Sequence, residues 1–128
     1  MTIPAILFGL LAAAATATPP PSPPLRIERH VLQTVEPQAG QHVVQGSVNF
    51  PTGAVAERHL HRGIELIYVV SGDVEFYIGA DKPVTLHPGD TLLVPRDTPH
   101  GGRNTGRPAV VLSTWIIDKG APLAEPAP

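Results

Sequence analysis

The sequence predicts an all-β domain built from many short strands. Prolines are the first indication, because the chain of 128 residues contains 16 of them and proline breaks helix interiors. The second is that the central part of the chain shows no apolar stripe with the 3.6-residue period of a helix. The third is the pattern of short apolar runs, rich in Val, Ile, Leu, Tyr and Thr, which recur about every 8–12 residues, as in β-sandwiches and barrels.

These runs predict the strands in order along the chain. Gly, Pro and Asp form turn signals between them, at residues 71–73, 79–81, 87–90 and 96–99. A chain of this length has room for one core of ordinary size. The predicted strands are residues 25–33, 42–50, 55–61, 65–70, 74–78, 84–86, 91–94, 100–104 and 109–117.

Residues 1–17 are predicted to be a secretory signal peptide. Residues 3–15 are almost entirely apolar and uncharged, yet too short to cross a bilayer, which takes about 20 apolar residues. Ala15-Thr16-Ala17 fits the pattern for cleavage after Ala17. We therefore expect a secreted or periplasmic protein with no stable membrane anchor after cleavage. No Lys or Arg precedes the apolar run, so an uncleaved anchor or a mis-assigned start is the alternative.

The rest of the chain divides into a linker, a domain and a tail. Residues 18–24 contain five prolines and predict an extended, polyproline-like linker. Residues 25–119 form the predicted domain. Residues 120–128 are rich in Pro and Ala, and we expect them to form a tail that lies over the surface.

Composition excludes several classes of function. The net charge of −2 and the pI of about 6.3 provide no basic surface for nucleic acid. The absence of cysteine excludes disulfides, thiolate catalysis and cysteine-based zinc sites. The six histidines, against only two lysines, remain to be explained.

Three histidines and one glutamate form a candidate metal site. His59 and His61 are two residues apart, so on a strand their side chains leave the same face. Glu65 follows after a possible reversal at residues 62–63, and His100 begins a later strand. Three imidazoles and a carboxylate suit a divalent first-row transition metal. The His-x-His pair alone is weak, because such pairs also occur on exposed strands.

The longer pattern resembles the two motifs of the cupin family. Gly53, His59, His61, Glu65 and Gly72 match the first motif at every fixed position. After 16 further residues, the second motif is matched with one departure: Asp97 stands where the family has glycine. Asp tolerates positive φ better than most residues, so we expect the turn to form. The positions of the second motif are Gly89, Pro95, Asp97, His100 and Asn104.

The resemblance implies a double-stranded β-helix, or jelly-roll barrel, with little helix. It implies that His59, His61, Glu65 and His100 bind one divalent transition metal inside the barrel, with Fe, Mn, Ni, Cu, Co and Zn all suited to these ligands. It assigns Asn104 a structural role. Because small cupins often pair, it also implies a homodimer, with residues 25–33 as a candidate exchanging strand.

A few other residues are candidates for the site. Regular alternation would place Glu57 on the face of His59 as an acid or base at the barrel mouth; the alternative is a solvated rim carboxylate. Gly102 would leave space beside the metal. Arg96 and Arg103 flank His100 and would either attract an anion or lie exposed. The other candidates have no assigned position: Tyr68, Tyr77 and Trp115 in the cavity or an interface, and His30, His42 and His87 outside the motifs.

Known cupins include dioxygenases, isomerases, lyases and non-catalytic proteins, and the fold does not choose among them. We expect a metal-dependent enzyme acting on a small organic molecule, with dioxygenase chemistry slightly ahead of isomerase or lyase chemistry. The alternatives are a non-catalytic secreted cupin that binds a small molecule or metal, and a structural or interaction role without metal. A second carboxylate or a tyrosine in the cavity would favour catalysis, whereas a purely apolar lining would favour binding. The sequence indicates neither the substrate nor the residues that bind it.

Overall fold

A computed structural model describes residues 25–128, and the predicted signal peptide (1–17) and linker (18–24) lie outside this range. The described part contains strands and turns and no helix, so the predicted all-β class is confirmed. It accordingly includes no helix with the length and apolarity needed to cross a membrane.

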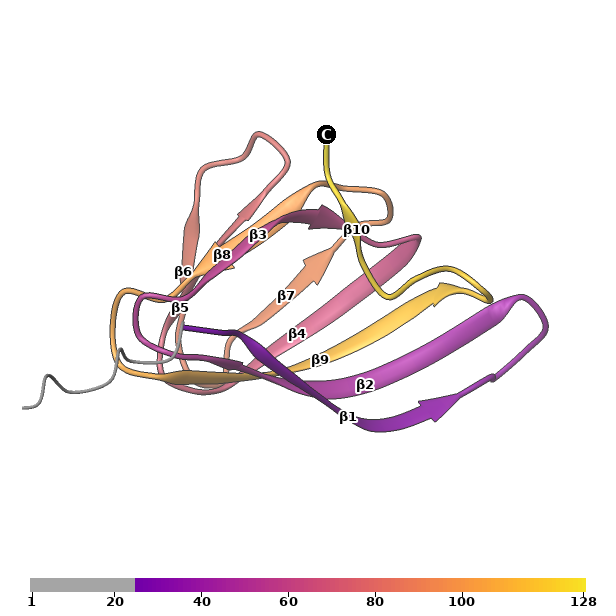
Figure 1. Ribbon diagram of the computed structural model, residues 1–128, viewed down its shortest axis with the longest axis horizontal. Helices are drawn as coiled ribbons and strands as arrows, with labels where there is room; N and C mark the ends of the chain where they lie inside the picture. Colours follow the sequence, from indigo (N-terminus) through magenta and orange to yellow (C-terminus); the bar gives the residue numbers. More distant parts are fainter. Residues whose placement is uncertain (1–24) are drawn as a thin grey trace, which may run out of the picture.

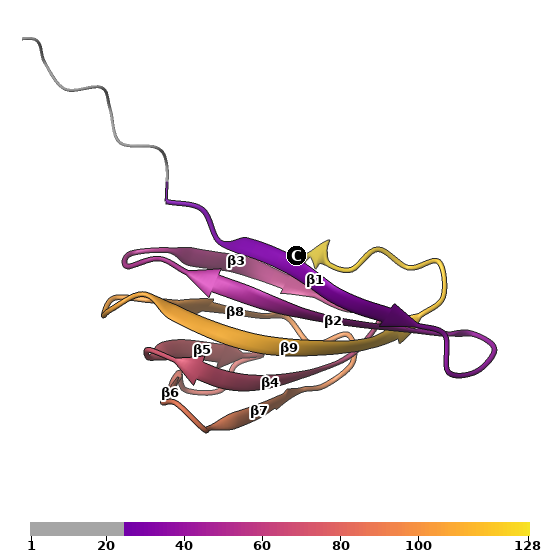
Figure 2. The same ribbon diagram turned by 90° about the horizontal axis from the view of Figure 1, so that it is seen from below.

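Two antiparallel five-stranded sheets face each other, as in a jelly roll. Figure 1 shows the first sheet along the lower right and the second at the upper left. In Figure 2 the strands of the first sheet follow one another from top to bottom. That sheet has the order β1 (Glu28–Val35), β2 (Gln41–Phe50), β9 (Ala109–Asp118), β4 (Gly63–Ser71) and β7 (Thr91–Val94). The second has the order β10 (Glu125–Pro126), β3 (Val55–Leu60), β8 (His100–Arg103), β5 (Val74–Ile78) and β6 (Val84–Leu86).

Strand β9 shows why these residues form a half-buried sheet. Every second side chain is buried, from Ala109 to Ile117, while those between are partly exposed. Its full length pairs with β2, from Gln41 opposite Asp118 to Phe50 opposite Ala109. The inward side chains meet those of the second sheet, where Phe50 and Phe76 pack edge to face with ring centroids 6.1 Å apart. The core therefore lies between the sheets, and the site is built into the same interior.

Asp97 adopts the conformation expected of its motif position. Its φ is 55°, and within residues 25–128 no other non-glycine residue has positive φ. Its backbone N–H donates to the carbonyl of His61 (3.0 Å), which ties the turn to the first motif. The turn therefore forms despite the departure from glycine.

The other motif positions shape loops. Gly72 has a φ of 69°, and a Cβ there would lie 2.5 Å from the carbonyl oxygen of Pro108. Asn104 is buried, and its amide donates to the carbonyls of Phe50 (2.9 Å) and Arg107 (2.7 Å). These contacts support the loops that connect β2 to β3 and β8 to β9.

The C-terminal segment does more than lie over the surface. Residues Glu125 and Pro126 form β10, which pairs with Leu60 and His59 of β3. Arg62 holds the Glu125 carboxylate with two nitrogens, at 3.1 and 2.9 Å. The segment therefore extends the sheet that carries two of the candidate ligands (Figure 1).

Candidate metal centre

The fold brings together the four residues that the sequence predicts as metal ligands. His59 lies near the end of β3, His61 follows that strand, Glu65 lies on β4 and His100 begins β8. Their ligand atoms lie within 4.8 Å of one another. His61, Glu65 and His100 are buried, and His59 is partly exposed at the cavity. Both sheets therefore contribute to one compact donor set.

Each imidazole is oriented by a backbone carbonyl. The Nδ1 atoms of His59, His61 and His100 lie 2.7, 2.5 and 2.9 Å from the carbonyl oxygens of Glu57, Leu123 and Thr98, respectively. Since a carbonyl oxygen can only accept, each Nδ1 carries the hydrogen. In the neutral imidazole, Nε2 then presents a lone pair.

These lone pairs converge on the Glu65 carboxylate. Its Oε2 lies 3.0 Å from Nε2 of His61 and 3.2 Å from Nε2 of His100. Acceptors this close repel one another unless a proton or a metal ion lies between them. The donor set therefore fits a divalent transition metal, with three imidazole nitrogens and one carboxylate oxygen as ligands.

Burial and neighbouring groups set the charge states of the site. Burial lowers the pKa of His59, which favours the neutral imidazole that binds metal. Burial alone would raise the pKa of Glu65, but when a proton lies between its carboxylate and the Nε2 atoms of His100 and His61, the hydrogen bonds hold that pKa well below its usual value. Glu65 is therefore ionised at neutral pH.

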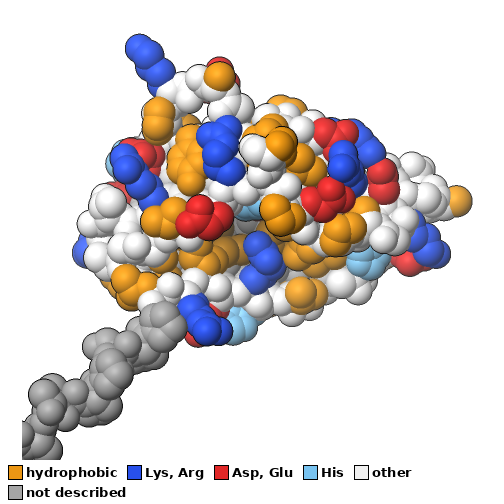
Figure 3. Space-filling view, turned by 45° about the horizontal axis from the view of Figure 1, so that its top comes forward, with side chains coloured by type: hydrophobic (Ala, Val, Ile, Leu, Met, Phe, Trp, Pro, Cys, Tyr) orange, Lys and Arg blue, Asp and Glu red, His pale blue; other side chains and the backbone are white. Residues whose placement is uncertain are grey.

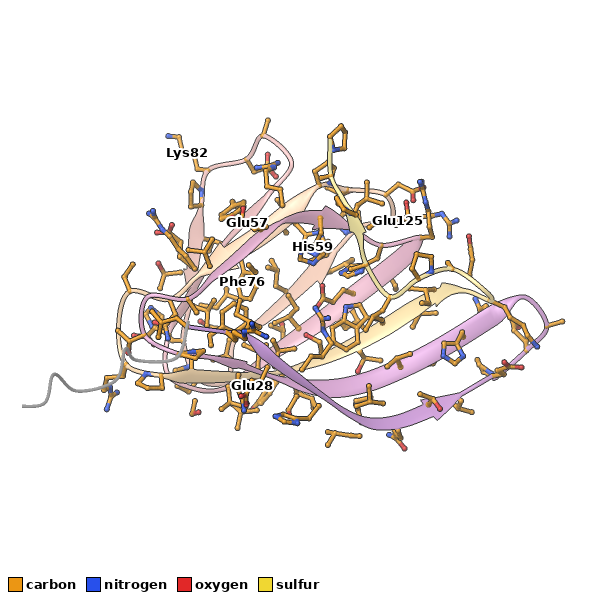
Figure 4. The ribbon with its side chains drawn as sticks, in the orientation of Figure 1. Glu28, Glu57, His59, Phe76, Lys82 and Glu125 are labelled. Atoms are coloured by element: carbon orange, nitrogen blue, oxygen red, sulfur yellow. The ribbon has the colours of Figure 1, made fainter. Side chains whose placement is uncertain are left out.

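A β-bulge in β3 keeps Glu57 out of the site. Ala56 pairs with Gly102 and His59 pairs with His100, so the two residues between Ala56 and His59 face the single residue Gly101. The extra residue interrupts the alternation, and both Ala56 and His59 line the cavity. Figure 4 shows Glu57 on the opposite side of β3 from His59. The expectation that Glu57 shares the face of His59 is therefore not met; its carbonyl, rather than its carboxylate, contacts the site.

The cavity beside the four residues is small, with a volume of about 40 Å³ available to the centres of water-sized molecules. In Figure 3 an apolar hollow opens on the surface, with charged side chains at its rim. Arg29 and Ser113 are polar lining residues besides the candidate ligands. Neither a tyrosine nor a second carboxylate of the described chain lines it. The apolar part comes from both sheets: Ile27, Val48, Phe50, Ala56, Ile67, Phe76, Val111 and Trp115.

Several other sequence candidates lie away from the cavity. A Cβ on Gly102 would lie 3.1 Å from the Phe76 ring, so that ring occupies the space expected beside the metal. Arg96 pairs with Asp118, and Arg103 pairs with Glu75. Tyr77 donates to the carbonyl of Ala56 beneath Arg58, and Tyr68 is exposed on the first sheet.

Sequence reasoning missed three contributors to the site. Arg29 lines the cavity from β1, and Ser113 lines it from β9. Leu123 supplies the carbonyl that accepts from Nδ1 of His61. The alternation of β9 would have placed Ser113 inward, on the face of Val111 and Trp115. No local pattern marks Arg29 or Leu123, because their contacts join distant parts of the chain.

A family model described as "Cupin domain" matches residues 46–116, more than half of the chain. The chain belongs to the cupin family. Among curated proteins, this cupin is 30% identical over 82 residues to dimethylsulfoniopropionate lyase DddQ of Ruegeria pomeroyi, covering 64% of the chain and 41% of the lyase. It is 35% identical over 51 residues to a nitrosourea synthase of Streptomyces achromogenes, covering 40% of the chain and 11% of the synthase. The cupin thus spans less than half the length of these curated relatives.

Solved structures share the fold. The crystal structure of the Ruegeria pomeroyi lyase has a TM-score of 0.69 at 24% identity, with 80% of this chain and 52% of the lyase covered. An uncharacterised protein of Klebsiella pneumoniae with a double-stranded β-helix domain has a TM-score of 0.63 at 26% identity, with 82% and 89% covered. The jelly roll implied by the two motifs is therefore confirmed.

Proposed function

We propose that this cupin is a metal-dependent enzyme that acts on a small organic molecule, with lyase chemistry as the first reaction class to test. One observation carries the proposal: backbone carbonyls fix the three Nδ1 atoms, and this aims three Nε2 atoms and the Glu65 carboxylate at one point on the cavity wall. Residues held this way form a preorganised metal site beside a space for substrate.

Lyase chemistry comes first because a lyase is among the relatives. The matched region of the dimethylsulfoniopropionate lyase covers 64% of this chain. This places lyase chemistry ahead of the dioxygenase chemistry that the sequence alone favoured. A bound divalent ion would supply Lewis-acid polarisation of a substrate oxygen.

The residues of the chain would divide the remaining work. His59, His61, Glu65 and His100 would hold the ion. The rings of Phe50 and Phe76 line the cavity and would exclude water from the substrate's apolar part. Ser113 and Trp115 complete the wall of the cavity beside these rings.

A specific observation favours a second candidate, a non-catalytic binding protein. No tyrosine or second carboxylate of residues 25–128 lines the cavity, so Glu65 is its only carboxylate. A ligand-binding cupin needs the apolar lining and the metal, but no further acid or base.

One experiment separates these functions. The purified protein is loaded in turn with Fe(II), Mn(II), Co(II), Ni(II), Cu(II) and Zn(II), its metal content is measured, and substrate loss is followed by NMR. The substrates are dimethylsulfoniopropionate and a panel of enolic, phenolic and sugar-acid compounds. Turnover that is absent from a His100→Ala variant supports the enzyme. Stoichiometric metal with tight binding but no turnover supports the binding protein, and protein that takes up no metal contradicts both.

We also propose that the protein is a homodimer. Exposed apolar side chains gather on the outer face of the first sheet, on β4 and β7: Leu66, Tyr68, Val70 and Leu93. Strand β1 pairs with β2 of its own chain and forms an edge of that sheet. Light scattering after size-exclusion chromatography tests the proposal, and a Leu66→Glu, Leu93→Glu variant is expected to run as a monomer. Export, which residues 1–17 suggest, is tested by N-terminal sequencing of the mature protein.

A further inference from the structure

Arg29 reaches the cavity from the edge strand β1. It pairs with Val48 of β2, whose side chain is buried between the sheets, so Arg29 points toward the same interior. Its guanidinium carbon lies 5.3 Å from the centre of the Trp115 ring, and both residues line the cavity. The indole therefore supports one face of the guanidinium and leaves its N–H edge available.

No carboxylate of the described residues forms an ion pair with this arginine. Within residues 25–128, Arg62, Arg96 and Arg103 each pair with an Asp or Glu, whereas the side chain of Arg29 makes no such pair. The carboxylate of Glu28, the preceding residue, lies 3.6 Å from Nε2 of His30. Glu28 and His30 share the face of β1 opposite to that of Arg29. Arg29 is exposed to solvent, so its charge is tolerated without a partner and its N–H groups are accessible to a ligand that enters the cavity.

The charge balance of the cavity favours an anion. A divalent metal carries two positive charges, of which the Glu65 carboxylate neutralises one. Arg29 adds a further positive charge, and the other lining residues are mostly apolar. The loaded cavity thus has excess positive charge, part of which lies on the exposed Arg29.

We propose that the substrate of this cupin is a small carboxylate with an apolar body, and that Arg29 binds its carboxylate. The substrate would make a second contact, between its reacting end and the metal, and for that contact the proposal rests on the proposed function. The planar N–H edge of Arg29 matches the two oxygens of a carboxylate. The apolar wall of the cavity takes the hydrocarbon part.

Trp115 provides a direct readout, because it is the chain's one tryptophan and contacts Arg29. The probes are sodium butyrate and butyramide, which share an apolar body but differ in charge, titrated at constant ionic strength with tryptophan fluorescence as the signal. Both metal-free and Zn(II)-loaded protein are used. Arg29→Met keeps a long apolar side chain over the indole and removes the charge. Arg26→Met is the matched control, because Arg26 is exposed like Arg29 but does not line the cavity.

We expect Arg29→Met to weaken butyrate binding at least tenfold while leaving butyramide binding unchanged, and Arg26→Met to behave like the wild type. Arg29→Lys keeps the charge and is expected to recover part of the affinity. Unchanged butyrate binding in Arg29→Met overturns the proposal. So does a wild-type protein whose fluorescence responds to butyrate no more than to sodium chloride at the same concentration. Inorganic phosphate that binds through Arg29 more tightly than butyrate overturns the carboxylate assignment.

The outcomes also distinguish this proposal from the proposed function. Arg29-dependent butyrate binding to a protein that takes up no metal supports the anion site and contradicts the metal-dependent enzyme. Stoichiometric metal uptake with butyrate binding that does not depend on Arg29 supports the metal site and contradicts the carboxylate site at Arg29. Circular dichroism and the metal content of each variant show whether the fold and the four ligands are intact.

Discussion

The carbonyl of Leu123 accepts a hydrogen bond from Nδ1 of His61, a residue 62 positions earlier in the chain. This contact joins the C-terminal segment to the candidate metal centre. The Arg62–Glu125 ion pair and the pairing of β10 with β3 hold the segment in place just beyond Leu123. A ligand histidine with a fixed Nδ1–H partner has a fixed tautomer and ring orientation.

Removal of residues 121–128 is therefore expected to weaken metal binding about 10- to 100-fold, the effect typical of losing an outer hydrogen-bond partner. Competition with a chelator measures the affinity. Leu123→Ala is the matched control, since it keeps the backbone carbonyl and removes only the side chain. Equal metal affinity in the truncated and full-length proteins would show that the Leu123 carbonyl does not position His61.

Removal of a ligand is expected to abolish metal-dependent stabilisation. A metal ion that binds only the folded protein stabilises it by about 2.7 kcal/mol when the ion concentration is 100 times Kd. The wild-type Tm should therefore rise on addition of metal, and that of His100→Ala or Glu65→Gln should not. His87→Ala serves as the control, because His87 is an exposed histidine on a turn away from the site. A ligand variant whose Tm still rises like that of the wild type would contradict the ligand set.

Asp97 allows a test of backbone strain in the second motif. At its φ of 55°, a β-branched residue is strained, so Asp97→Val should lower the free energy of unfolding by about 1–2 kcal/mol. Asp97→Gly relieves the backbone but removes the exposed ion pairs with Arg62 and Arg96, which contribute little, so its net effect should be small. Urea unfolding measures both. A Val variant as stable as the Gly variant would argue against strain at this turn.

The pair of His87 and Asp73 predicts a dependence of stability on pH. Its Nδ1 and Oδ1 atoms lie 2.9 Å apart, and the hydrogen bond to Asp73 raises the pKa of His87 in the folded protein. A raised pKa means that the folded state binds the proton more tightly. The contribution is therefore complete below the ordinary histidine pKa and is lost as the pH rises through the raised value.

Asp73→Asn is accordingly expected to lower the Tm more at pH 5 than at pH 9. Both residues are exposed, so added salt should reduce the difference. Lys119→Gln, which removes another exposed pair (with Glu36), is a useful control because no histidine titration governs that pair's cation. The interpretation would be wrong if the effect of Asp73→Asn were the same at both pH values.

Much of the site could be predicted because its chemistry is local. The spacing of His59, His61 and Glu65 and the position of His100 mark the donor set, and the fold brings all four together. The turn at Asp97 could be predicted for the same reason, since positive φ depends on the residue itself. Glu57 shows the limit: the position of a bulge depends on pairing with β8, and alternation within β3 alone does not reveal it.

The sequence by itself therefore determined the all-β class, the family and the four candidate ligands, because strand periodicity and motif spacing are properties of short segments. Only the tertiary structure decided which groups surround those ligands. It turned Glu57 outward, placed Arg29 over Trp115 and brought the Leu123 carbonyl to His61. Each of these depends on strand register and on contacts between distant segments, which form only when the two sheets pack together.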